Sequence, residues 1–404
     1  MSTRGTVLFV DDESKILRSL RRSFFQAEFD CRFSESALDA LTIIESEPID
    51  ILVTDIRMPH MDGLQLLKIV RDKHPAINRI VLSGFVEQKA VMSALNSGLA
   101  STYFAKPWED KVLYDRLVHI LGVRSSLKDR RLLNMLGRLE SFPTFPGIYM
   151  DFIEAVEQER AISEITQIIE RDVTASAKIL KVANSAFFGA QKVNSLSKAV
   201  VKIGLLPVKN VILTLSIISN MKWKAVQVAQ LEEIFLHSFL VNRYVGRFYR
   251  MQFGSEMPPR FSSLGIVHDI GKIILLQYLP DQYERILLHM RTKHPDFYTA
   301  EIALGFEGRT HSEIGAYFID HWNLPELFVE TSLFHHRPEE TQEDYRDIMR
   351  LLNFTDRFVH YVTETPAAVS PDFDAFDCAD FAPTSLLELS FQVRKDMLER
   401  EFFW

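Results

Sequence analysis

The N-terminal part of the chain alternates five times between a short apolar run and a longer amphipathic stretch, and this alternation restricts the possible folds more than any other feature. The apolar, β-branched runs lie at residues 6–10, 31–33, 49–54, 79–82 and 102–105. The amphipathic stretches occupy residues 14–28, 36–45, 64–73, 87–96 and 109–121. Strands that alternate with helices through short connections form a parallel sheet covered by helices on both faces. We therefore expect a doubly wound α/β domain with a five-stranded parallel sheet.

Polar and charged side chains follow four of these strands at the point where each strand ends. They are Asp11, Asp12 and Glu13 after the first strand, Asp55 after the third, Ser83 after the fourth and Lys106 with Pro107 after the fifth. The carboxyl ends of parallel strands meet at one edge of the sheet, where ligands bind. Carboxylates gathered there repel each other unless a cation lies between them, and a site with only oxygen ligands suits Mg²⁺.

These residue types together are typical of phosphoryl transfer to an aspartate. A lysine opposite the carboxylates can neutralise a phosphoryl oxygen, and a serine hydroxyl can donate a hydrogen bond to another oxygen. An aspartate can then act as the nucleophile. Each residue also has a structural explanation, since paired aspartates often cap helices and the serine and lysine fit a turn and a strand exit. The combination of all four, in this order, favours the phosphoryl-transfer site.

The same segments resemble the response-regulator receiver family over residues 5–121. The resemblance rests on residues 7–13, which read VLFVDDE, on residues 55–63, which read DIRMPHMDG, and on Lys106-Pro107. It implies a flavodoxin-like fold in which Asp55 accepts a phosphoryl group from a sensor histidine kinase or phosphotransfer protein. The resemblance also implies that Asp12, Asp55 and the carbonyl of Arg57 hold Mg²⁺, with Asp11 helping through water. It implies that Ser83 and Tyr103 are the switch pair and that Lys106 binds the phosphoryl group. The Lys106–Pro107 bond is expected to be cis.

The second half of the chain has a helical pattern with little strand. Residues 142–147 read FPTFPG, and two prolines with a glycine cannot continue a helix. Asp172 precedes an amphipathic run to Ala183, as an N-cap residue does, and another helix is expected over residues 196–203. We therefore expect a second, all-α domain after the α/β domain.

Histidines and acids in this half form an ordered set that could hold a second metal ion. The set is Glu233, His237, His268, Asp269, His311, His335, His336 and Asp356, with Lys272 nearby. Residues four apart share a helix face, so Glu233 with His237, and His268 with Lys272, can point at one centre. Imidazoles with bridging carboxylates suit Fe, Mn, Zn or Ni. The alternative is structural: a His-Asp pair often lies at a helix end, and paired histidines can finish a helix.

This half resembles the HDOD domain, a relative of the HD-GYP cyclic-di-GMP phosphodiesterases, from about residue 139 to residue 360. The matching segments are residues 141–146 (SFPTFP), 182–188 (VANSAFF), 203–204 (IG), 268–272 (HDIGK), 311–316 (HSEIGA), 322–325 (WNLP) and 335–336 (HH). The family is regarded as a signalling or binding module and not as an enzyme. The Gly-Tyr-Pro loop of HD-GYP enzymes is missing, since residues 337–340 read RPEE, so we expect no hydrolysis of cyclic-di-GMP. The retained ligand set leaves catalysis open.

Composition excludes several other classes. With 47% hydrophobic and 25% charged residues the chain is typical of a soluble globular protein, and its two cysteines indicate a reducing compartment. No apolar run is long enough to span a bilayer, and no signal peptide is expected, so we expect a cytoplasmic protein without membrane contact. The net charge of −8 argues against nucleic-acid binding, and the basic residues at 124–131 are expected on a solvated helix face.

The expected organisation has four parts. They are a receiver domain at residues 1–122, a helical linker at 123–138, an HDOD output domain at 139–362, and a C-terminal loop and amphipathic helix at 363–404. We expect a response regulator of a phosphorelay in which phosphorylation of Asp55 controls an HDOD signalling or protein-interaction output, in cyclic-di-GMP regulation. Its expected partners are the upstream kinase and a downstream protein such as an HD-GYP phosphodiesterase, with homodimerisation as a possibility. The alternative is a receiver-gated, metal-dependent phosphohydrolase of the HD superfamily.

Overall fold

The structure is a computed structural model of the chain, and it forms two compact units. It describes residues 5–84, 90–91, 94–95, 98–127, 132–134, 147–184, 192–218, 221, 223–293, 296–322, 324–364 and 381–398. The first unit comprises Met1–Thr144 and Gly305–Pro325, and the second comprises Phe145–Leu304 and Glu326–Trp404. Among the described residues, no helix is long and apolar enough to cross a membrane.

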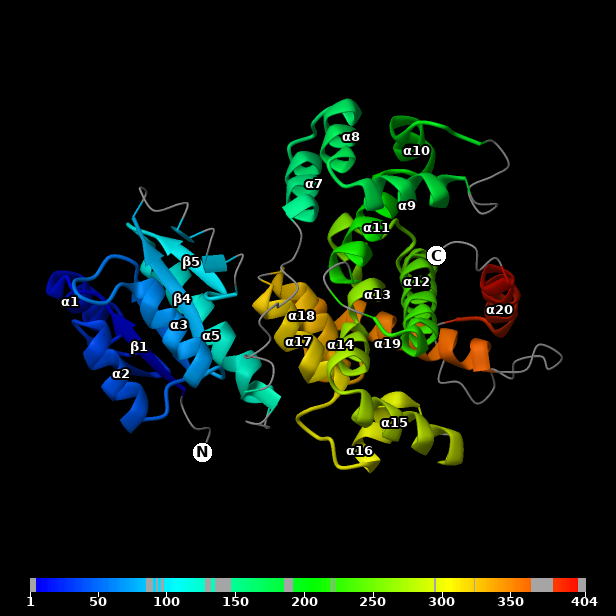
Figure 1. The fold of residues 1–404 in the computed structure, drawn as a ribbon. Helices are drawn as coiled ribbons and strands as arrows, with labels where there is room; N and C mark the ends of the chain where they lie inside the picture. The colour runs from blue at the N-terminus through cyan, green and yellow to red at the C-terminus, as the bar shows by residue number, and fades with distance from the viewer. Residues whose placement is uncertain are drawn as a thin grey trace. The chain divides into compact units, whose positions relative to one another are not determined.

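The first unit contains a five-stranded parallel sheet with the strand order β2-β1-β3-β4-β5 (Figure 1). The strands are β1 (Thr6–Val10), β2 (Asp30–Ser34), β3 (Ile51–Asp55), β4 (Asn78–Ser83) and β5 (Thr102–Ala105). The predicted α/β fold is therefore confirmed, and the strands lie where the apolar runs indicated. The crossover after β2 brings β3 beside β1, so the carboxyl ends of β1 and β3 are neighbours.

Helices cover both faces of this sheet. They are α1 (Ser14–Ser23), α2 (Ala37–Ser46), α3 (Gly63–Lys73) and α5 (Asp110–Ser126). Leu8 and Leu52 point to the face that packs against α2 and α3, whereas their neighbours Val7 and Ile51 point to the face that packs against α1 and α5. The alternation of strand side chains thus builds two apolar cores. Most of the helix predicted at residues 87–96 lies outside the described residues.

Helix α5 continues beyond its predicted end at residue 121 because its last turns are anchored. The buried guanidinium of Arg124 donates hydrogen bonds to the carbonyl of Ala76 and the carboxylate of Asp50. Gly122 within the helix does not end it. The expectation of a solvated basic face is therefore wrong for Arg124, and residues 128–131 of that stretch lie outside the described residues.

The first unit also contains a helix from much later in the chain. Helix α17 (His311–His321) packs against α5. Thr310 caps its first turn together with Glu313. Near the other end, Arg116 of α5 donates hydrogen bonds to the carboxylate of Asp320 (2.6 Å) and to its backbone carbonyl (3.0 Å). His119 Nε2 lies 3.2 Å from the same carboxylate.

The second unit is helical, and its described residues contain no strand, as predicted. Its α-helices are α7 (Gly147–Glu157), α8 (Ile162–Glu170), α9 (Val173–Ala183), α10 (Leu196–Ile203), α11 (Leu205–Ile218), α12 (Ala225–Phe253), α13 (Leu264–Val267), α14 (Ile270–Tyr278), α15 (Pro280–Lys293), α16 (Phe297–Ala303), α18 (Glu326–Phe334), α19 (Arg346–Glu364) and α20 (Pro383–Leu398). Short 3₁₀ turns occupy Pro259–Phe261, Pro338–Glu340 and Glu343–Tyr345.

Local sequence signals explain several of these helix ends. The side chain of Asp172 accepts a hydrogen bond from the Ala175 amide at the start of α9, and that of Ser195 accepts one from the Lys198 amide at the start of α10. The predicted N-cap and the helix over residues 196–203 are thereby confirmed. The C-terminal helix α20 is tied to α12, since Asp396 accepts a hydrogen bond from the Tyr244 hydroxyl at 2.8 Å. The apolar end at residues 402–404 lies outside the described residues.

Candidate functional sites

The first candidate site lies at the carboxyl edge of the sheet and is organised by Lys106. Its ammonium lies 2.7 Å from Asp11 Oδ2 and 2.7 Å from Asp55 Oδ1, so one cation bridges the ends of β1 and β3. Asp11 is buried, and Asp12 beside it is exposed. The three carboxylates and the one ammonium leave this edge with two negative charges more than positive ones. That excess fits a divalent cation bound by oxygen ligands.

Burial and nearby charges have opposite effects on the ionisation of this site. Burial raises the pKa of Asp11 above its usual value and the Asp55 carboxylate adds to this, while Lys106 and the Glu13 amide act against it. Burial alone would lower the pKa of Lys106, but hydrogen bonds to the two aspartates outweigh it and raise that pKa. The lysine is therefore a permanent cation in this site.

The loop after β3 holds Asp55 in place. The Arg57 amide donates a hydrogen bond to Asp55 Oδ2 at 3.0 Å, and the Gly63 amide donates one to the Ile56 carbonyl at 2.8 Å. A Cβ atom at position 63 would lie 1.9 Å from the Asp55 carbonyl oxygen, so only glycine allows this close approach. Asp62, the residue before Gly63, caps the start of α3, because its side chain accepts a hydrogen bond from the Gln65 amide.

The other residues expected at this site have clear places. Ser83 is buried at the end of β4, and its hydroxyl lies 3.1 Å from the Gly84 carbonyl oxygen. Tyr103 on β5 is 48% exposed, so its ring lies outside the core. Arg57 follows Asp55 on the loop and is exposed. The Lys106–Pro107 bond is cis, as expected.

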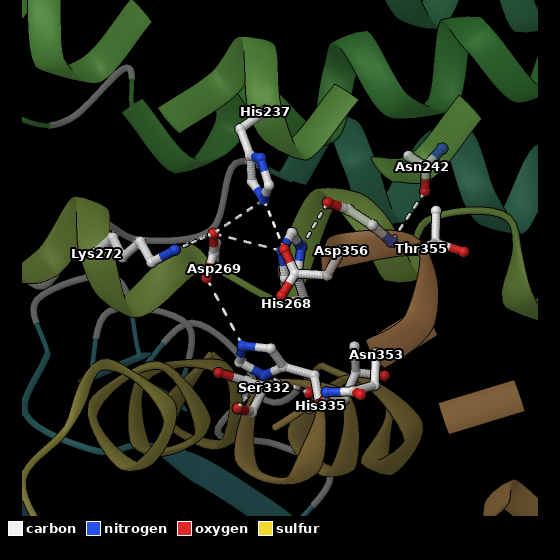
Figure 2. A network of polar contacts seen from close by, with 12 residues as sticks. His237, Asn242, His268, Asp269, Lys272, Ser332, His335, Asn353, Thr355 and Asp356 are labelled. Carbon is white, nitrogen blue, oxygen red and sulfur yellow. Dashed lines mark hydrogen bonds and ion pairs between the residues drawn. The ribbon is translucent and has the colours of Figure 1, made fainter. Parts of the chain in front are cut away.

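The second candidate site lies in the second unit, where four helical segments bring charged side chains together (Figure 2). His237 comes from α12, His268 and Asp269 from the junction of α13 and α14, His335 from the end of α18, and Asp356 from α19. Gly265 lets α13 pack closely against α12, because a Cβ atom at position 265 would lie 2.3 Å from the backbone nitrogen of Asn242.

The distances in this cluster are short. His237 Nε2 lies 2.8 Å from Asp356 Oδ1 and 3.7 Å from Asp269 Oδ2. His268 Nε2 lies 3.3 Å from Asp269 Oδ2 and 3.7 Å from Asp356 Oδ1. His335 Nε2 approaches Asp269 from the other side, 3.7 Å from Oδ1 (Figure 2). Asp269 therefore lies between three imidazoles.

Backbone contacts set which ring nitrogen faces the centre. His268 Nδ1 lies 2.8 Å from the Gly265 carbonyl oxygen, and His335 Nδ1 lies 2.9 Å from the Ser332 carbonyl oxygen. These nitrogens must donate, which directs both Nε2 atoms toward Asp269. The buried Nε2 of His268 makes no hydrogen bond within the described part of the chain. A buried polar atom of this kind fits a ligand to a metal ion.

The buried carboxylates and imidazoles stabilise each other as ions. Burial alone would lower the pKa of His268, but Asp269 and Asp356 outweigh it and raise the pKa to about 10. Burial alone would raise the pKa values of Asp269 and Asp356, but the histidines, and Lys272 at Asp269, hold both well below the usual range. A metal ion would take the place of the proton on the imidazole nitrogen.

The cluster opens onto a cavity of about 840 Å³. Its wall includes His237, Asp269, Lys272, His336 and Asp356 from the predicted set. The donor atoms of His237, His268 and Asp269 lie within 4.8 Å of one another, and so do those of Asp269, His335 and His336. This donor set fits a transition metal, which His237, His268, Asp269, His335 and Asp356 would hold. The metal would supply a Lewis acid beside the cavity.

Glu233 and Lys272 do not take the places that their spacing predicted. Glu233 is exposed and lines the cavity, and among the described residues it forms no ion pair with His237, so the shared helix face did not bring the two side chains together. Lys272 pairs with Asp269 at 2.6 Å, three residues away, and not with His268. His311 is buried at the start of α17 in the first unit. Its role as a ligand stays a prediction.

Sequence reasoning missed several cavity residues, among them Tyr283 and His360. Tyr283 on α15 and His360 on α19 line the cavity, and neither lies in a motif that drew attention to it. The position of His360 four residues after Asp356 places it on the same helix face, and this spacing was the available signal. Burial and the neighbouring His237 and Lys272 lower the pKa of His360 below its usual value.

Comparison with known proteins assigns both units. Residues 7–118 match the response regulator receiver domain family, and residues 142–338 match the HDOD domain family. The chain is a two-component response regulator with an HDOD domain. The HDOD match includes the residues of α17, the helix that packs against α5 in the first unit.

Individual relatives share parts of this response regulator. The DNA-binding transcriptional regulator NtrC of Proteus hauseri is 39% identical over 106 residues, which cover 26% of this chain and 22% of the relative. The hydrogenase transcriptional regulatory protein HoxA of Bradyrhizobium diazoefficiens is 35% identical over 115 residues, covering 28% and 24%. The chain thus spans less than a quarter of the length of these curated relatives.

Two solved structures are similar to parts of the response regulator. The receiver domain of an HD domain-containing protein from Pseudomonas fluorescens Pf-5 is 30% identical, with a TM-score of 0.29, and the match covers 30% of this chain and 98% of that one. An HDOD domain protein of unknown function from Geobacter sulfurreducens is 20% identical, with a TM-score of 0.48, and the match covers 72% of this chain and 92% of that one.

Proposed function

We propose that phosphorylation of Asp55 by a sensor histidine kinase or phosphotransfer protein controls the HDOD domain, and that the protein works in the cytoplasm as a signalling adaptor. The observation that carries this proposal is the position of Lys106, whose ammonium is 2.7 Å from both Asp11 Oδ2 and Asp55 Oδ1. Such a cation can move from the carboxylates to a phosphoryl oxygen without leaving the site.

Each residue of this site has a separate role in the reaction. An Asp55 carboxylate oxygen attacks the phosphorus, the new O–P bond forms, and the P–N bond to the donor histidine breaks with its electron pair going to that nitrogen. Lys106 neutralises the phosphoryl oxygens. Asp12, Asp55 and the carbonyl of Arg57 would hold Mg²⁺, with Asp11 acting through water, and the ion would offset charge on the phosphoryl group.

The signal would leave the site through Ser83 and Tyr103. The Ser83 hydroxyl can turn from the Gly84 carbonyl to donate to a phosphoryl oxygen, and Tyr103, now exposed, can turn into the space that is vacated. This rearrangement reshapes the surface that β5 and α5 share. Helix α17 packs on α5, and the chain before and after residues 305–325 belongs to the second unit. We therefore assign α17 the role of transmitting the change.

The test is acetyl phosphate treatment of the full chain with Mg²⁺, followed by intact-mass measurement. We expect one added phosphoryl group in the natural protein and none in Asp55→Asn. Labelling that persists undiminished in Asp55→Asn would overturn the assignment. The downstream partner under this proposal is an HD-GYP phosphodiesterase or another enzyme of cyclic-di-GMP metabolism, or a second copy of the chain, and co-sedimentation with phosphorylated protein would identify it.

A second candidate function is a receiver-gated, metal-dependent phosphohydrolase. It is favoured by the convergence of His237, His268 and Asp269 and by a cavity of about 840 Å³ whose wall includes His237 and Asp269. Metal analysis of the purified protein and a screen of phosphate esters would test it. Turnover that is lost in Asp269→Ala would support it, whereas a metal-loaded protein without turnover on any ester would support the adaptor. We expect no hydrolysis of cyclic-di-GMP, because the Gly-Tyr-Pro loop is missing.

A further inference from the structure

One stretch of the HDOD domain carries positive charge only. Residues 173–231 contain eight lysines and no aspartate, glutamate, arginine or histidine. The remaining 38 basic and 54 acidic residues give the rest of the chain a net charge of −16. Solvated protein surfaces usually mix charges of both signs. A stretch of this length without an acid therefore indicates a surface that uses its positive charge.

The fold places the basic face of α10 beside the C-terminal end of α9. The two helices pack against each other (Figure 1). The ammonium of Lys202 on α10 donates a hydrogen bond to the carbonyl oxygen of Ala183, the last residue of α9, at 2.6 Å. Lys198 lies four residues before Lys202 and shares its face of α10.

Three more lysines lie around the C-terminal half of α9. Lys181 is exposed two residues before the end of the helix, and Lys178 precedes it by one turn. The side chain of Asn184 donates a hydrogen bond to the Val193 carbonyl at 2.8 Å and accepts one from the Val193 amide at 2.7 Å, which holds the exposed Lys192 at this end. We call the five side chains the lysine surface: Lys178, Lys181, Lys192, Lys198 and Lys202.

Neighbouring acids compensate this charge only in part. Burial and Lys181 lower the pKa of Lys178 to about 8, and Glu232 of α12 acts against them. Helix α8 packs on both α9 and α10 and carries Glu164 and Glu170, whereas α11 carries no acid. Three acids against five lysines leave the surface positive. The exposed Lys181, Lys192 and Lys198 form no ion pair within the described part of the chain.

The type of cation indicates which anion fits. The stretch holds eight of the 18 lysines of the chain and none of its 28 arginines. Arginine pairs with phosphate and carboxylate in a fixed, bidentate geometry, whereas lysine is a hydrated point charge on a flexible stem. Among the described residues of the stretch, no large aromatic side chain is exposed for stacking on a base. A diffuse anionic surface therefore fits better than a nucleic acid.

Two aliphatic side chains are exposed to water beside these lysines. Val201 is 68% exposed between Lys198 and Lys202, and Leu206 is 45% exposed at the start of α11. The cations at the end of a helix also stabilise it, but that role does not require exposed aliphatic neighbours. Lysines around exposed aliphatic residues are typical of surfaces that lie on lipid headgroups, where the lysine stems cover apolar groups and the ammoniums meet phosphates.

We propose that the lysine surface, together with Val201 and Leu206, binds the surface of an anionic lipid bilayer. The contact is peripheral, with the ammoniums against the lipid phosphates, and it requires no spanning helix. It holds the HDOD domain at a membrane whether the domain is an adaptor or a phosphohydrolase. The proposal replaces the expectation of no membrane contact, which concerned spanning segments only.

The test is co-sedimentation of the full-length, unphosphorylated protein with lipid vesicles. Vesicles of phosphatidylglycerol mixed with phosphatidylcholine are compared with vesicles of phosphatidylcholine alone. The natural protein should bind only the first kind. This binding should be lost between about 0.1 M and about 1 M salt, as the Debye length falls from about 10 Å to about 3 Å. Because the whole chain has a net charge of −8, a general attraction to anionic vesicles does not account for such binding.

The decisive variant combines Lys181→Gln, Lys192→Gln and Lys198→Gln. We expect its partition coefficient on the anionic vesicles to fall about 100-fold, because each lysine near an anionic membrane contributes about 5-fold. Its melting temperature should match that of the natural protein, since all three side chains are exposed. The same protein with Asp55→Asn alone should bind vesicles like the natural protein, which separates this proposal from the proposed phosphorylation.

The matched control replaces three exposed lysines of the first unit, Lys68, Lys73 and Lys111, by glutamine. It changes the net charge of the chain by the same amount and should bind vesicles like the natural protein. A natural protein that does not bind the anionic vesicles, equal binding to phosphatidylcholine alone, or equal losses in the two triple variants would each overturn the proposal. Binding of a DNA duplex, or self-association, that depends on the three lysines while vesicles are not bound would overturn it as well.

Discussion

Arg116 of α5 holds Asp320 of α17 by two hydrogen bonds, one to the carboxylate at 2.6 Å and one to the backbone carbonyl at 3.0 Å. The Asp320 side chain is almost completely buried, and Arg116 and His119 hold its pKa below the usual range although burial acts in the opposite direction. The C-terminal end of α17 is thus fixed to the helix that leads out of the receiver fold. A buried ion pair of this kind favours one arrangement of two helices over others.

Replacing Arg116 with alanine should destabilise the first unit. The change leaves Asp320 buried with only His119 beside it, so we expect a loss of about 2–3 kcal/mol in the free energy of unfolding. Urea unfolding followed by circular dichroism measures it. Arg71→Ala is the matched control, because Arg71 pairs with the exposed Asp72, and it should cost less than about 0.5 kcal/mol. Equal losses in both variants would contradict a structural role for the Arg116–Asp320 pair.

Gly63→Ala should damage both the stability and the phosphoryl acceptance of the receiver. The added methyl group would meet the Asp55 carbonyl oxygen, and overpacking against backbone costs about 1–3 kcal/mol or more. We expect a lower melting temperature and slower labelling by acetyl phosphate. Gly122→Ala in α5 is the control, since nothing lies within 4 Å of its Cβ position, and it should be neutral or stabilising by up to about 1 kcal/mol. A Gly63→Ala protein as stable and reactive as the natural one would show that the close approach is unimportant.

The stability of the metal-free protein should fall as the pH rises. The folded-state pKa of His268 is raised from 6.5 to about 10, so the protonated ring stabilises the fold fully below pH 6.5, and this contribution is lost as the pH rises to about 10. Urea unfolding in the presence of a chelator, over this range, measures the slope. His268→Gln cannot titrate and should show a smaller slope. If both proteins have the same slope, the imidazole is not protonated in the folded state.

Metal binding should show the opposite dependence on pH. A metal ion at His268 Nε2 competes with the proton that Asp269 and Asp356 favour there, so the affinity for Mn²⁺ or Zn²⁺ should increase from pH 6.5 toward pH 10 with release of protons. Isothermal titration calorimetry in two buffers with different ionisation enthalpies counts the protons. Binding that is strongest at the acidic end would place the metal away from this imidazole.

The receiver site was readable from sequence because its chemistry is concentrated at strand ends. Parallel strands with short connections fix which ends are neighbours, and the positions of Asp11, Asp55 and Lys106 follow from that geometry. For the cluster of the second unit, the sequence predicted which residues take part, but not which side chains form ion pairs with each other. The partner of Lys272 is Asp269 because α14 begins between them, and periodicity alone cannot locate a helix start to within one residue.

Other features depend on contacts between residues far apart in the sequence. The packing of α17 on α5 joins residues 204 positions apart, and no local pattern indicates it. Arg124 was expected to be solvated because its neighbours are basic. Its side chain is instead buried, and it donates hydrogen bonds to the Asp50 carboxylate and the Ala76 carbonyl. Tyr283 has an ordinary helical context, and only the fold shows that it lines the cavity.

Hydrogen exchange of α17 tests most directly whether phosphorylation of Asp55 controls the HDOD domain. The full chain with Mg²⁺ is compared with and without acetyl phosphate, alongside Asp55→Asn treated in the same way, and phosphorylation is confirmed by intact mass. We predict that exchange across His311–His321 changes in the phosphorylated natural protein and stays the same in Asp55→Asn. A fully phosphorylated protein with unchanged exchange in α17 and in α14 would contradict the account.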